Sequence, residues 1–273
     1  MTAGARRHPR RTDADQGTWT GVALRLAAVA ALVAAWQVGT LLAADPVFWP
    51  TAEVIAVRLW EMWIANPTAW VEDGMPSLAR LLGGWLAAAL AGVAIGTAVG
   101  LLPWLSHVLE PVMAFLRSIP PPALLPPFIV LLGIGDGMKV ALILFGAVWP
   151  VVLNAADGVA NVDPTTRDAA RAFRLSIADI LTRVVLPAAA PRILAGLRVS
   201  LSIAVILMVI SELYAATDGI GFRLVQAQRG FRTVDVWATV VLLGLIGYAL
   251  NGLLAVLEAR LLRGQRARTG GTR

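Results

Sequence analysis

Phosphate chemistry in this chain would depend on lysine, and lysine occurs once. A P-loop holds a nucleotide through the pattern G-x-x-x-x-G-K-[ST], in which the lysine contacts the phosphates. Lys139 instead stands in the string GDGMKVA, outside any such pattern. The chain therefore has no P-loop of its own, and if ATP drives its function, another subunit must bind the nucleotide.

Carboxylate chemistry is a second possibility, and Asp136 carries a short motif for it. The string GIGD, residues 133–136, matches the G-x-G-D pattern of intramembrane aspartyl proteases. Their chemistry needs two carboxylates that share one proton, and the second follows a tyrosine in an earlier span. Tyr214 and Tyr248 are the only tyrosines; both come later, and neither precedes an aspartate. We expect Asp136 to lie in a turn, and a protease is the less favoured alternative.

Ser211 and Glu212 are polar residues inside a long apolar stretch. Ser211 has no histidine in the same stretch to activate it as a nucleophile. A carboxylate inside a membrane is costly and usually faces the bundle interior or a cavity. Glu212 is therefore either a pathway or gating residue, or a carboxylate near the outer end that reaches water or pairs with an arginine such as Arg223.

The composition indicates a membrane protein. The chain has 273 residues, 58% of them hydrophobic, and a mean hydropathy of +0.73, whereas soluble domains are about 45–50% apolar. Apolar stretches long enough to cross a hydrocarbon core of ~30 Å recur along it. The chain has no cysteine, hence no disulfide or thiolate metal site. Its net charge of +6 has a topological explanation, so no nucleic acid is expected as a partner.

The hydropathy pattern predicts an all-α polytopic protein with six spans, at 21–42, 81–102, 109–132, 138–156, 195–216 and 234–257. An even number places both termini on one side, and cytoplasmic loops carry an excess of basic residues. With the termini inside, the inner segments hold fourteen arginines: Arg6, Arg7, Arg10, Arg11, Arg167, Arg171, Arg174, Arg183, Arg192, Arg260, Arg263, Arg266, Arg268 and Arg273. The outer segments hold six basic residues: Arg58, Arg80, Lys139, Arg223, Arg229 and Arg232. The bias favours cytoplasmic termini.

The third expected span contains five prolines within eight residues, from 120 to 127. Each lacks an N–H and clashes with the preceding turn, so the stretch cannot be one straight helix. Broken backbone at membrane depth is tolerated where protein buries it or where it lines a watery cavity. The stretch is a candidate pathway wall, or a kinked helix packed on its neighbours. The candidate pathway residues are Ser118, Pro120, Pro121, Pro122, Ser211 and Glu212.

Residues 164–187, between the fourth and fifth spans, predict two short helices. Asp163 before Pro164 is a favourable helix start, and that helix would end near Phe173. Ser176 and Asp179 form the capping pattern of a second helix, whose apolar residues recur at helical spacing until Leu186-Pro187 ends it. We expect a cytoplasmic helix–turn–helix, here called the coupling unit (164–187), with an apolar side under the bundle and a charged side exposing Phe173. The alternative is a helix pair that only joins two spans.

The coupling unit resembles the "EAA…G…LP" cytoplasmic loop of ATP-binding cassette importer permeases of the binding-protein-dependent type. Asp168, Ala169 and Ala170 stand at its opening positions, and Leu186 and Pro187 at its closing pair. The strings SLARLLGGW, SIPPPALLPPFIVLLGIGD and AAAPRILAGLRVSLSIAVILMVISEL are also similar to that family. The resemblance covers roughly residues 70–260 and is closest to the permeases of nitrate, sulfonate and taurine importers.

Two positions depart from the family pattern. Asp168 replaces glutamate and still offers a carboxylate. Arg174 stands where the family has glycine, at a position that often adopts the left-handed conformation, which costs other residues roughly 1–2 kcal/mol. Either the turn takes another shape, or Arg174 accepts the strain and contacts a partner.

The resemblance implies a bundle like that of type I importers, working as a homodimer in a bacterial inner membrane. Its implied partners are ATPase subunits, which bind ATP and magnesium, and an extracytoplasmic solute-binding protein; no cofactor is expected in this chain.

The expected segments are a cytoplasmic tail (1–20), a first span with an outer interfacial segment (21–69), the permease core (70–260) and a cytoplasmic tail (261–273). The implied ATPase-coupling residues are Asp168, Ala169, Ala170, Phe173, Arg174, Leu186 and Pro187. The implied solute is a sulfonate, nitrate, taurine or a related small solute; a secondary transporter or channel would not need the coupling unit.

Overall fold

The computed structural model describes residues 12–43 and 47–269, and its regular elements within those ranges are all helices. The long helices are α1 (Thr12–Leu42), α4 (Met75–Leu101), α5 (Pro103–Ser118), α7 (Asp136–Ala160), α10 (Leu186–Ala215) and α12 (Thr233–Thr269). The short ones are α2 (Ala52–Leu59), α3 (Pro67–Ala69), α6 (Leu125–Leu132), α8 (Pro164–Ala172), α9 (Ile177–Asp179) and α11 (Ile220–Arg229). Single π-helical turns follow α2, α3 and α9, and the 3₁₀ turn η3 (Pro121–Leu124) precedes α6. The expected all-α class is confirmed.

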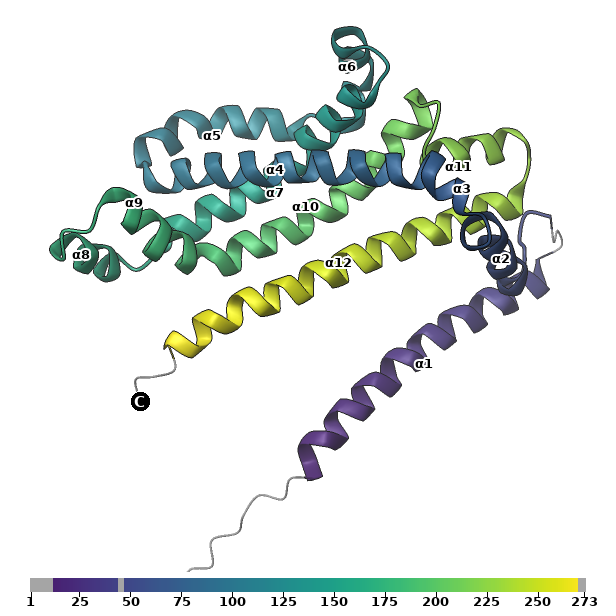
Figure 1. Ribbon diagram of the computed structural model, residues 1–273, viewed down its shortest axis with the longest axis horizontal. Helices are drawn as coiled ribbons and strands as arrows, with labels where there is room; N and C mark the ends of the chain where they lie inside the picture. Colours follow the sequence, from purple (N-terminus) through teal and green to yellow (C-terminus); the bar gives the residue numbers. More distant parts are fainter. Residues whose placement is uncertain (1–11, 44–46, 270–273) are drawn as a thin grey trace, which may run out of the picture.

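Three helices, α4, α7 and α10, form the packed centre of the molecule, and α7 lies between the other two (Figure 1). Small residues on α4 allow the close approach to α7. A Cβ atom on Gly92 would lie 2.6 Å from the Cβ of Val151, and one on Gly96 would lie 2.4 Å from the carbonyl oxygen of Val152. Inside a membrane the hydrophobic effect does not drive helices together, because lipid tails are as apolar as the side chains. Small residues let the helix backbones approach closely, so that van der Waals contacts hold them together. The three helices therefore form one tightly fitted unit, here called the core.

The predicted break in the third span is confirmed. α5 and α6 meet at an angle of 85° across residues 119–120 and η3 (Figure 1). Ile119 and Pro120 have extended backbone, with ψ values of 119° and 121°, and η3 begins at Pro121. The prolines therefore interrupt the helix, as their missing N–H groups predict, and they divide the predicted span into two helices.

Four helical segments in the described ranges are long and apolar enough to cross a membrane, and the bent pair α5–α6 makes a fifth. The apolar part of α1, Ala27–Leu42, is shorter than the others. The chain is therefore a multi-pass membrane protein, and the count of six spans stays a prediction. The helix of α12 also runs to Thr269, into the segment expected as a tail.

The segment between α1 and α4 and the last span, α12, form a second layer beside the core. α12 contacts α2, α10 and α11, whereas α1 lies apart from the core and contacts α2. Trp36 of α1 packs edge-on against Trp237 of α12, with ring centroids 4.7 Å apart. Figure 1 shows α12 running back from this end to the side where α8 and α9 lie.

Candidate functional site

The coupling unit begins as its capping residues predict. The side chain of Asp163 accepts a hydrogen bond of 3.1 Å from the backbone N–H of Thr165, and Pro164 is the first residue of α8. The hydroxyl and the N–H of Thr165 lower the pKa of Asp163, so the carboxylate stays charged beside the helix N-terminus. Ser176 accepts a 3.1 Å bond from the N–H of Asp179 and donates a 2.6 Å bond to its carboxylate. Both predicted helix starts are confirmed.

The turn between the two helices is left-handed, and Arg174 is the residue that adopts this conformation, with φ of 54°. The N–H of Leu175 donates to the carbonyl oxygen of Ala170 at 3.2 Å, and that of Arg174 donates to Arg171 at 2.8 Å. These two bonds define a Schellman motif, in which glycine normally occupies the left-handed position. The structure therefore has the left-handed turn in which Arg174 accepts the strain, and a contact of Arg174 with a partner stays a prediction.

This turn presents apolar side chains to the surroundings. Phe173 is 81% exposed and Ile177 is 87% exposed, on either side of the turn. Asp168 and Ala169 are also exposed, and Asp168 pairs with Arg171 at 3.3 Å on the same helix. Ala170 is buried instead. The opposite side of the unit packs under the core, where Val185 and Ala189 are buried with the ends of α7 and α10.

The predicted end of the second helix at Leu186-Pro187 is wrong. The helix continues through the π-helical turn Ile180–Val185 into α10, so that Ile177–Ala215 is one helical segment of 39 residues. Proline lacks an N–H and its ring clashes with a carbonyl in the preceding turn. A π-turn is a known way for a helix to accommodate such an interruption. Leu186 and Pro187, both half-buried, therefore lie inside a continuous helix.

The candidate pathway residues before α6 lie at the break. Ser118 is exposed and donates a 2.6 Å bond to the carbonyl oxygen of Phe115, and Pro120 and Pro122 are exposed. Pro121 packs on Gly146 of α7, where an added Cβ would lie 3.0 Å from the proline Cγ. The break thus touches the middle of the core, next to Leu207 of α10.

Ser211 and Glu212 lie further toward the C-terminal end of α10, and both are fully buried. Ser211 donates its hydroxyl to the carbonyl oxygen of Met208 at 2.8 Å, a local helix contact. Glu212 accepts hydrogen bonds of 2.8 Å from Ser77 and 2.9 Å from both Arg80 and the N–H of Gly221. Its partner is therefore Arg80, and Arg223 pairs with Asp73 and Glu72 instead.

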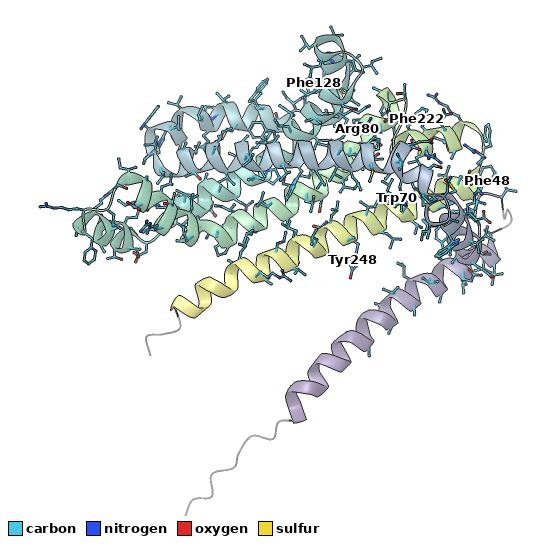
Figure 2. All side chains as sticks on the ribbon, viewed as in Figure 1. Phe48, Trp70, Arg80, Phe128, Phe222 and Tyr248 are labelled. Carbon is cyan, nitrogen blue, oxygen red and sulfur yellow. The ribbon has the colours of Figure 1, made fainter. Side chains whose placement is uncertain are left out.

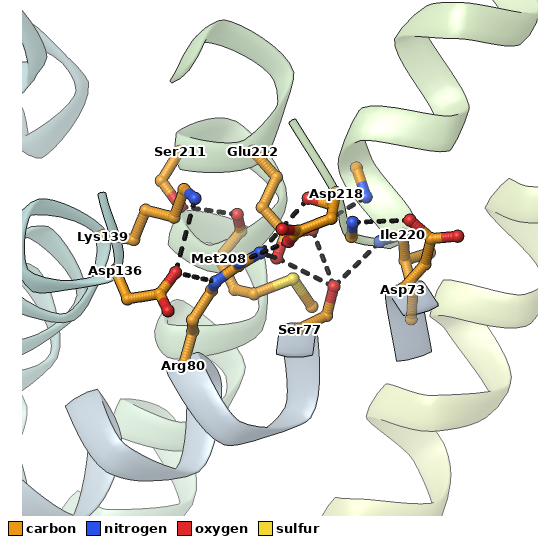
Figure 3. Close-up of polar contacts among 12 residues, drawn as sticks. Asp73, Ser77, Arg80, Asp136, Lys139, Met208, Ser211, Glu212, Asp218 and Ile220 are labelled. Carbon is orange, nitrogen blue, oxygen red and sulfur yellow. Dashed lines mark hydrogen bonds and ion pairs between the residues drawn. The ribbon is translucent and has the colours of Figure 1, made fainter. Parts of the chain in front are cut away.

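Arg80 joins four segments at this end of the molecule (Figure 3). From α4 its guanidinium bonds Glu212 on α10, Asp136 at the start of α7 at 2.6 Å, and both the side chain and the carbonyl oxygen of Asp218 before α11. We call Ser77, Arg80, Asp136, Glu212 and Asp218 the outer ion network. Arg80 is 5% exposed, so these bonds compensate for the removal of its charge from water.

Gly219 and Gly221, in the string DGIG (218–221), lie directly against the carboxylate of Glu212. Gly219 has φ of +113°, and a Cβ there would lie 2.5 Å from Oε2 of Glu212. Its N–H donates a 2.8 Å bond to Asp73, and the N–H of Ile220 donates one of 2.8 Å to Ser77. The backbone at the start of α11 is thereby bonded to Asp73 in the π-helical turn Trp70–Gly74 and to Ser77 in α4.

Asp136 is part of this ion network rather than of a protease dyad. Arg80 binds both Asp136 and Glu212, so each carboxylate has a guanidinium partner, and Lys139 lies 3.6 Å from Asp136. Sequence reasoning did not find Arg80 or Ser77. The available signal was one arginine at the start of an apolar span, in SLARLLGGW, because a charge at that place needs partners.

A small-residue helical core, a broken span and an exposed helix pair between two spans are features that suit a membrane transport subunit. The chain matches the model of the family described as "Binding-protein-dependent transport system inner membrane component" over residues 84–263, and it belongs to that family. As a member it is the permease component of an ATP-binding cassette importer and not an enzyme. Its partners are an ATPase subunit and a binding protein.

Individual relatives agree with this assignment. The chain is 33% identical to the taurine transport system permease protein of Escherichia coli over 246 residues, which cover 88% of this chain and 89% of that protein. It is 32% identical to the nitrate import permease protein of Leptolyngbya laminosa, with 67% and 66% covered. The inward-facing MetNI methionine transporter shares the fold, with a TM-score of 0.62 and 20% identity over 72% of this chain and 96% of that one.

Proposed function

We propose that two copies of this chain form the pathway of an importer, and that the coupling unit receives the motion of a separate ATPase. The observation that carries this proposal is the exposed turn of Phe173 and Ile177 at the cytoplasmic start of a 39-residue helix. At 1.5 Å per residue such a helix is about 58 Å long. It runs to Ala215, past Glu212 in the outer ion network.

A continuous helix of this length supports a direct mechanical link. Displacement of the turn moves α10, which is packed along α7 and bonded to α4 at its outer end. Switches of this kind act through rigid-body movements of packed elements between two arrangements. ATP and magnesium would bind to the ATPase, because Lys139, the one lysine of the chain, is buried beside Asp136 and has no P-loop around it.

The homodimer is supported by the break. Irregular backbone at membrane depth must be covered by protein or line a watery cavity. Pro120 and Pro122 are exposed in the single chain, and so are the nearby apolar residues Val130 and Leu131. A second copy across this face would enclose the break in a central pathway.

The orientation follows from the coupling unit. An ATPase is cytoplasmic, so α8 and α9 lie on the cytoplasmic side. In Figure 1 α12 ends on that side, and α1 runs from it toward α2. Both termini would therefore be cytoplasmic. The taurine and nitrate relatives support a small anionic or zwitterionic solute, with selectivity residing largely in the binding protein.

The test is reconstitution of the chain in liposomes with its ATPase and its binding protein, followed by uptake of labelled taurine and nitrate. We expect uptake only when both partners and ATP are present. Uptake by the chain alone, down a gradient and without ATP, would instead identify a channel or a secondary transporter and refute the proposal.

A further inference from the structure

The turn between α11 and α12 holds a strained and exposed phenylalanine, Phe231. Among the described residues, Phe231 and Arg174 are the two that have positive φ without being glycine, and φ is 54° in both. The N–H groups of Phe231 and Arg232 donate to carbonyl oxygens in the last turns of α11 at 3.1 and 2.9 Å, which is again the Schellman pattern. Gly230 stands one position earlier, yet its φ is −85°. A bulky residue therefore occupies the place that favours glycine, with its side chain 84% exposed.

Phe231 lies beyond a cluster of tryptophans that indicates the membrane boundary. Trp237 of α12 contacts Trp36 and Trp49, with ring centroids 4.7 and 6.1 Å away. Tryptophans gather at the membrane–water interface. From Trp237 back to Thr233, the first residue of α12, is about 6 Å at 1.5 Å per residue, and Phe231 precedes Thr233. The ring therefore stands on the water side of the interface rather than among lipid tails.

This turn also lies away from the face proposed for the second copy. Figure 1 shows the segment between α11 and α12 at the end of the molecule opposite α8 and α9, whereas the broken pair α5–α6 forms one side of it. Figure 2 places Phe222 of α11 at the same end and Phe128 of α6 on that side. A dimer formed across the break would therefore leave the turn open to a further partner.

A charged pocket of about 600 Å³ opens next to the turn, and Arg232 is part of its wall. Its walls come from α2, the two π-helical turns before α4, α11 and the start of α12. Carboxylates outnumber guanidiniums in this wall; the carboxylates are Glu61, Glu72, Asp73, Asp218 and Asp235, and the guanidiniums are Arg58, Arg223 and Arg232.

The three arginines of the pocket are already paired with its buried carboxylates. Asp235 binds Arg58 at 2.6 Å and Arg232 at 3.5 Å, and Asp73 binds Arg223. Both aspartates are buried, so these pairs neutralise charge inside the wall.

The mouth of the pocket has carboxylates left over. The side chains of Glu61 and Glu72 are more than half exposed, and Glu72 lies 3.7 Å from Arg223, farther than a direct hydrogen bond. A carboxylate has about four lone-pair sites, so both can accept further bonds. The mouth therefore favours a cation over an anion.

From the exposed ring and the acidic mouth beside it, we infer that Phe231 and this pocket receive the solute-binding protein, which meets them with an apolar socket flanked by lysine or arginine side chains. The inference rests on the proposed function, which places α8 and α9 in the cytoplasm and this turn outside. A few large side chains carry most of the binding energy of an interface, and complementary charges speed the encounter. The coupling unit has the same arrangement for the ATPase, with Phe173 beside a left-handed Arg174.

The first test measures the affinity of the labelled binding protein for the permease reconstituted with its ATPase in nanodiscs. We expect Phe231→Ala to weaken binding at least tenfold, while Gln228→Ala, an exposed change in the last turn of α11, alters it less than twofold. Phe231→Gly should weaken binding equally and raise the unfolding temperature, because glycine relieves the strain. This gain in stability would exclude misfolding as the cause. Unchanged affinity in Phe231→Ala overturns the inference.

The charge of the mouth is tested separately by the double variant E61Q/E72Q. Since rim charges act mainly on the association rate, we expect that rate to fall by about threefold or more at low salt and to differ little at high salt. The dissociation rate should change less than twofold. A faster association would show that the partner's surface is acidic, contrary to the inference.

A third measurement distinguishes a protein partner from the bilayer. The chain has no cysteine, so Phe231→Cys gives a single site for an environment-sensitive dye. The binding protein should shift the dye emission to the blue, and spin-labelled lipid should not quench it. Quenching by lipid without a response to the binding protein identifies a membrane anchor and overturns the inference. Uptake by the wild-type complex reports on the proposed function independently: if it transports while Phe231→Ala keeps its affinity, only the docking surface is wrong.

Discussion

Arg80 of α4 and Glu212 of α10 form a buried ion pair, with 2.9 Å between Nη1 and Oε1. The two residues are 132 positions apart in the chain; Arg80 also bonds Asp218 in the loop before α11, and Glu212 accepts a bond from the N–H of Gly221 in the first turn of α11. One contact therefore fixes the N-terminal end of α4, the C-terminal end of α10 and the segment that connects α10 to α12.

Replacing Glu212 by glutamine removes the charge and keeps the shape. Loss of one partner from a buried ion pair costs about 3–5 kcal/mol, and Arg80 retains Asp136 and Asp218, so we expect the lower end, about 3 kcal/mol. Thermal unfolding in detergent measures the change. Glu61→Gln is the control, since Glu61 is 55% exposed in its pair with Arg58 and should change stability by less than about 1 kcal/mol. Equal effects would show that the buried pair does not stabilise the bundle.

Arg174→Gly should stabilise the isolated permease by about 1 kcal/mol, because glycine adopts the left-handed conformation without the cost that arginine bears. Thermal unfolding of the purified chain measures this. Arg171→Gly, inside α8, is the control and should destabilise by a similar amount. If R174G gains stability but loses ATPase binding, the arginine contacts the partner; if it loses stability, the assigned turn geometry is wrong.

Local structure in this chain could be predicted because neighbouring residues determine it. Asp163 with Pro164, Ser176 with Asp179, and the prolines from 120 onward each act within one or two turns, and the structure has them as expected. The turn at Arg174 stayed open, since its shape depends on whether a penalty of roughly 1–2 kcal/mol is tolerated.

The remaining features depend on distant residues. Nothing near Glu212 indicates that its partner is Arg80 rather than Arg223, because only the packing of α4 on α7 and α10 brings them together. Pro187 was misjudged because a π-turn lets the helix continue past a proline that usually ends one. The rules that predict helix ends from sequence apply to α-helical turns, so they do not predict that a π-turn lets a helix continue past Pro187.

Phe173→Ala should reduce both co-purification of the ATPase and ATP-driven uptake by at least tenfold, because it removes a large exposed apolar contact from the coupling unit. Phe231→Ala is a closely matched control. Phe231 also follows a helix, α11, is 84% exposed, and stands next to an arginine, but it lies between α11 and α12, outside the coupling unit. It should leave ATPase binding unchanged. Undiminished ATPase binding and uptake in the Phe173 variant would place the coupling surface elsewhere.

Gly83 and Gly84 are adjacent on α4 and face different surroundings. A Cβ on Gly84 would lie 2.7 Å from the Cβ of Ile143, whereas nothing lies within 4 Å of one on Gly83. Gly84→Ala should therefore push α4 from α7 and destabilise the bundle by about 1–3 kcal/mol. Gly83→Ala should be neutral or stabilising by up to about 1 kcal/mol, because alanine favours helix. The unfolding temperatures of both variants in detergent measure these changes in stability. Since the two changes are chemically identical, only helix packing can separate them, and equal effects would contradict the close contact of α4 with α7.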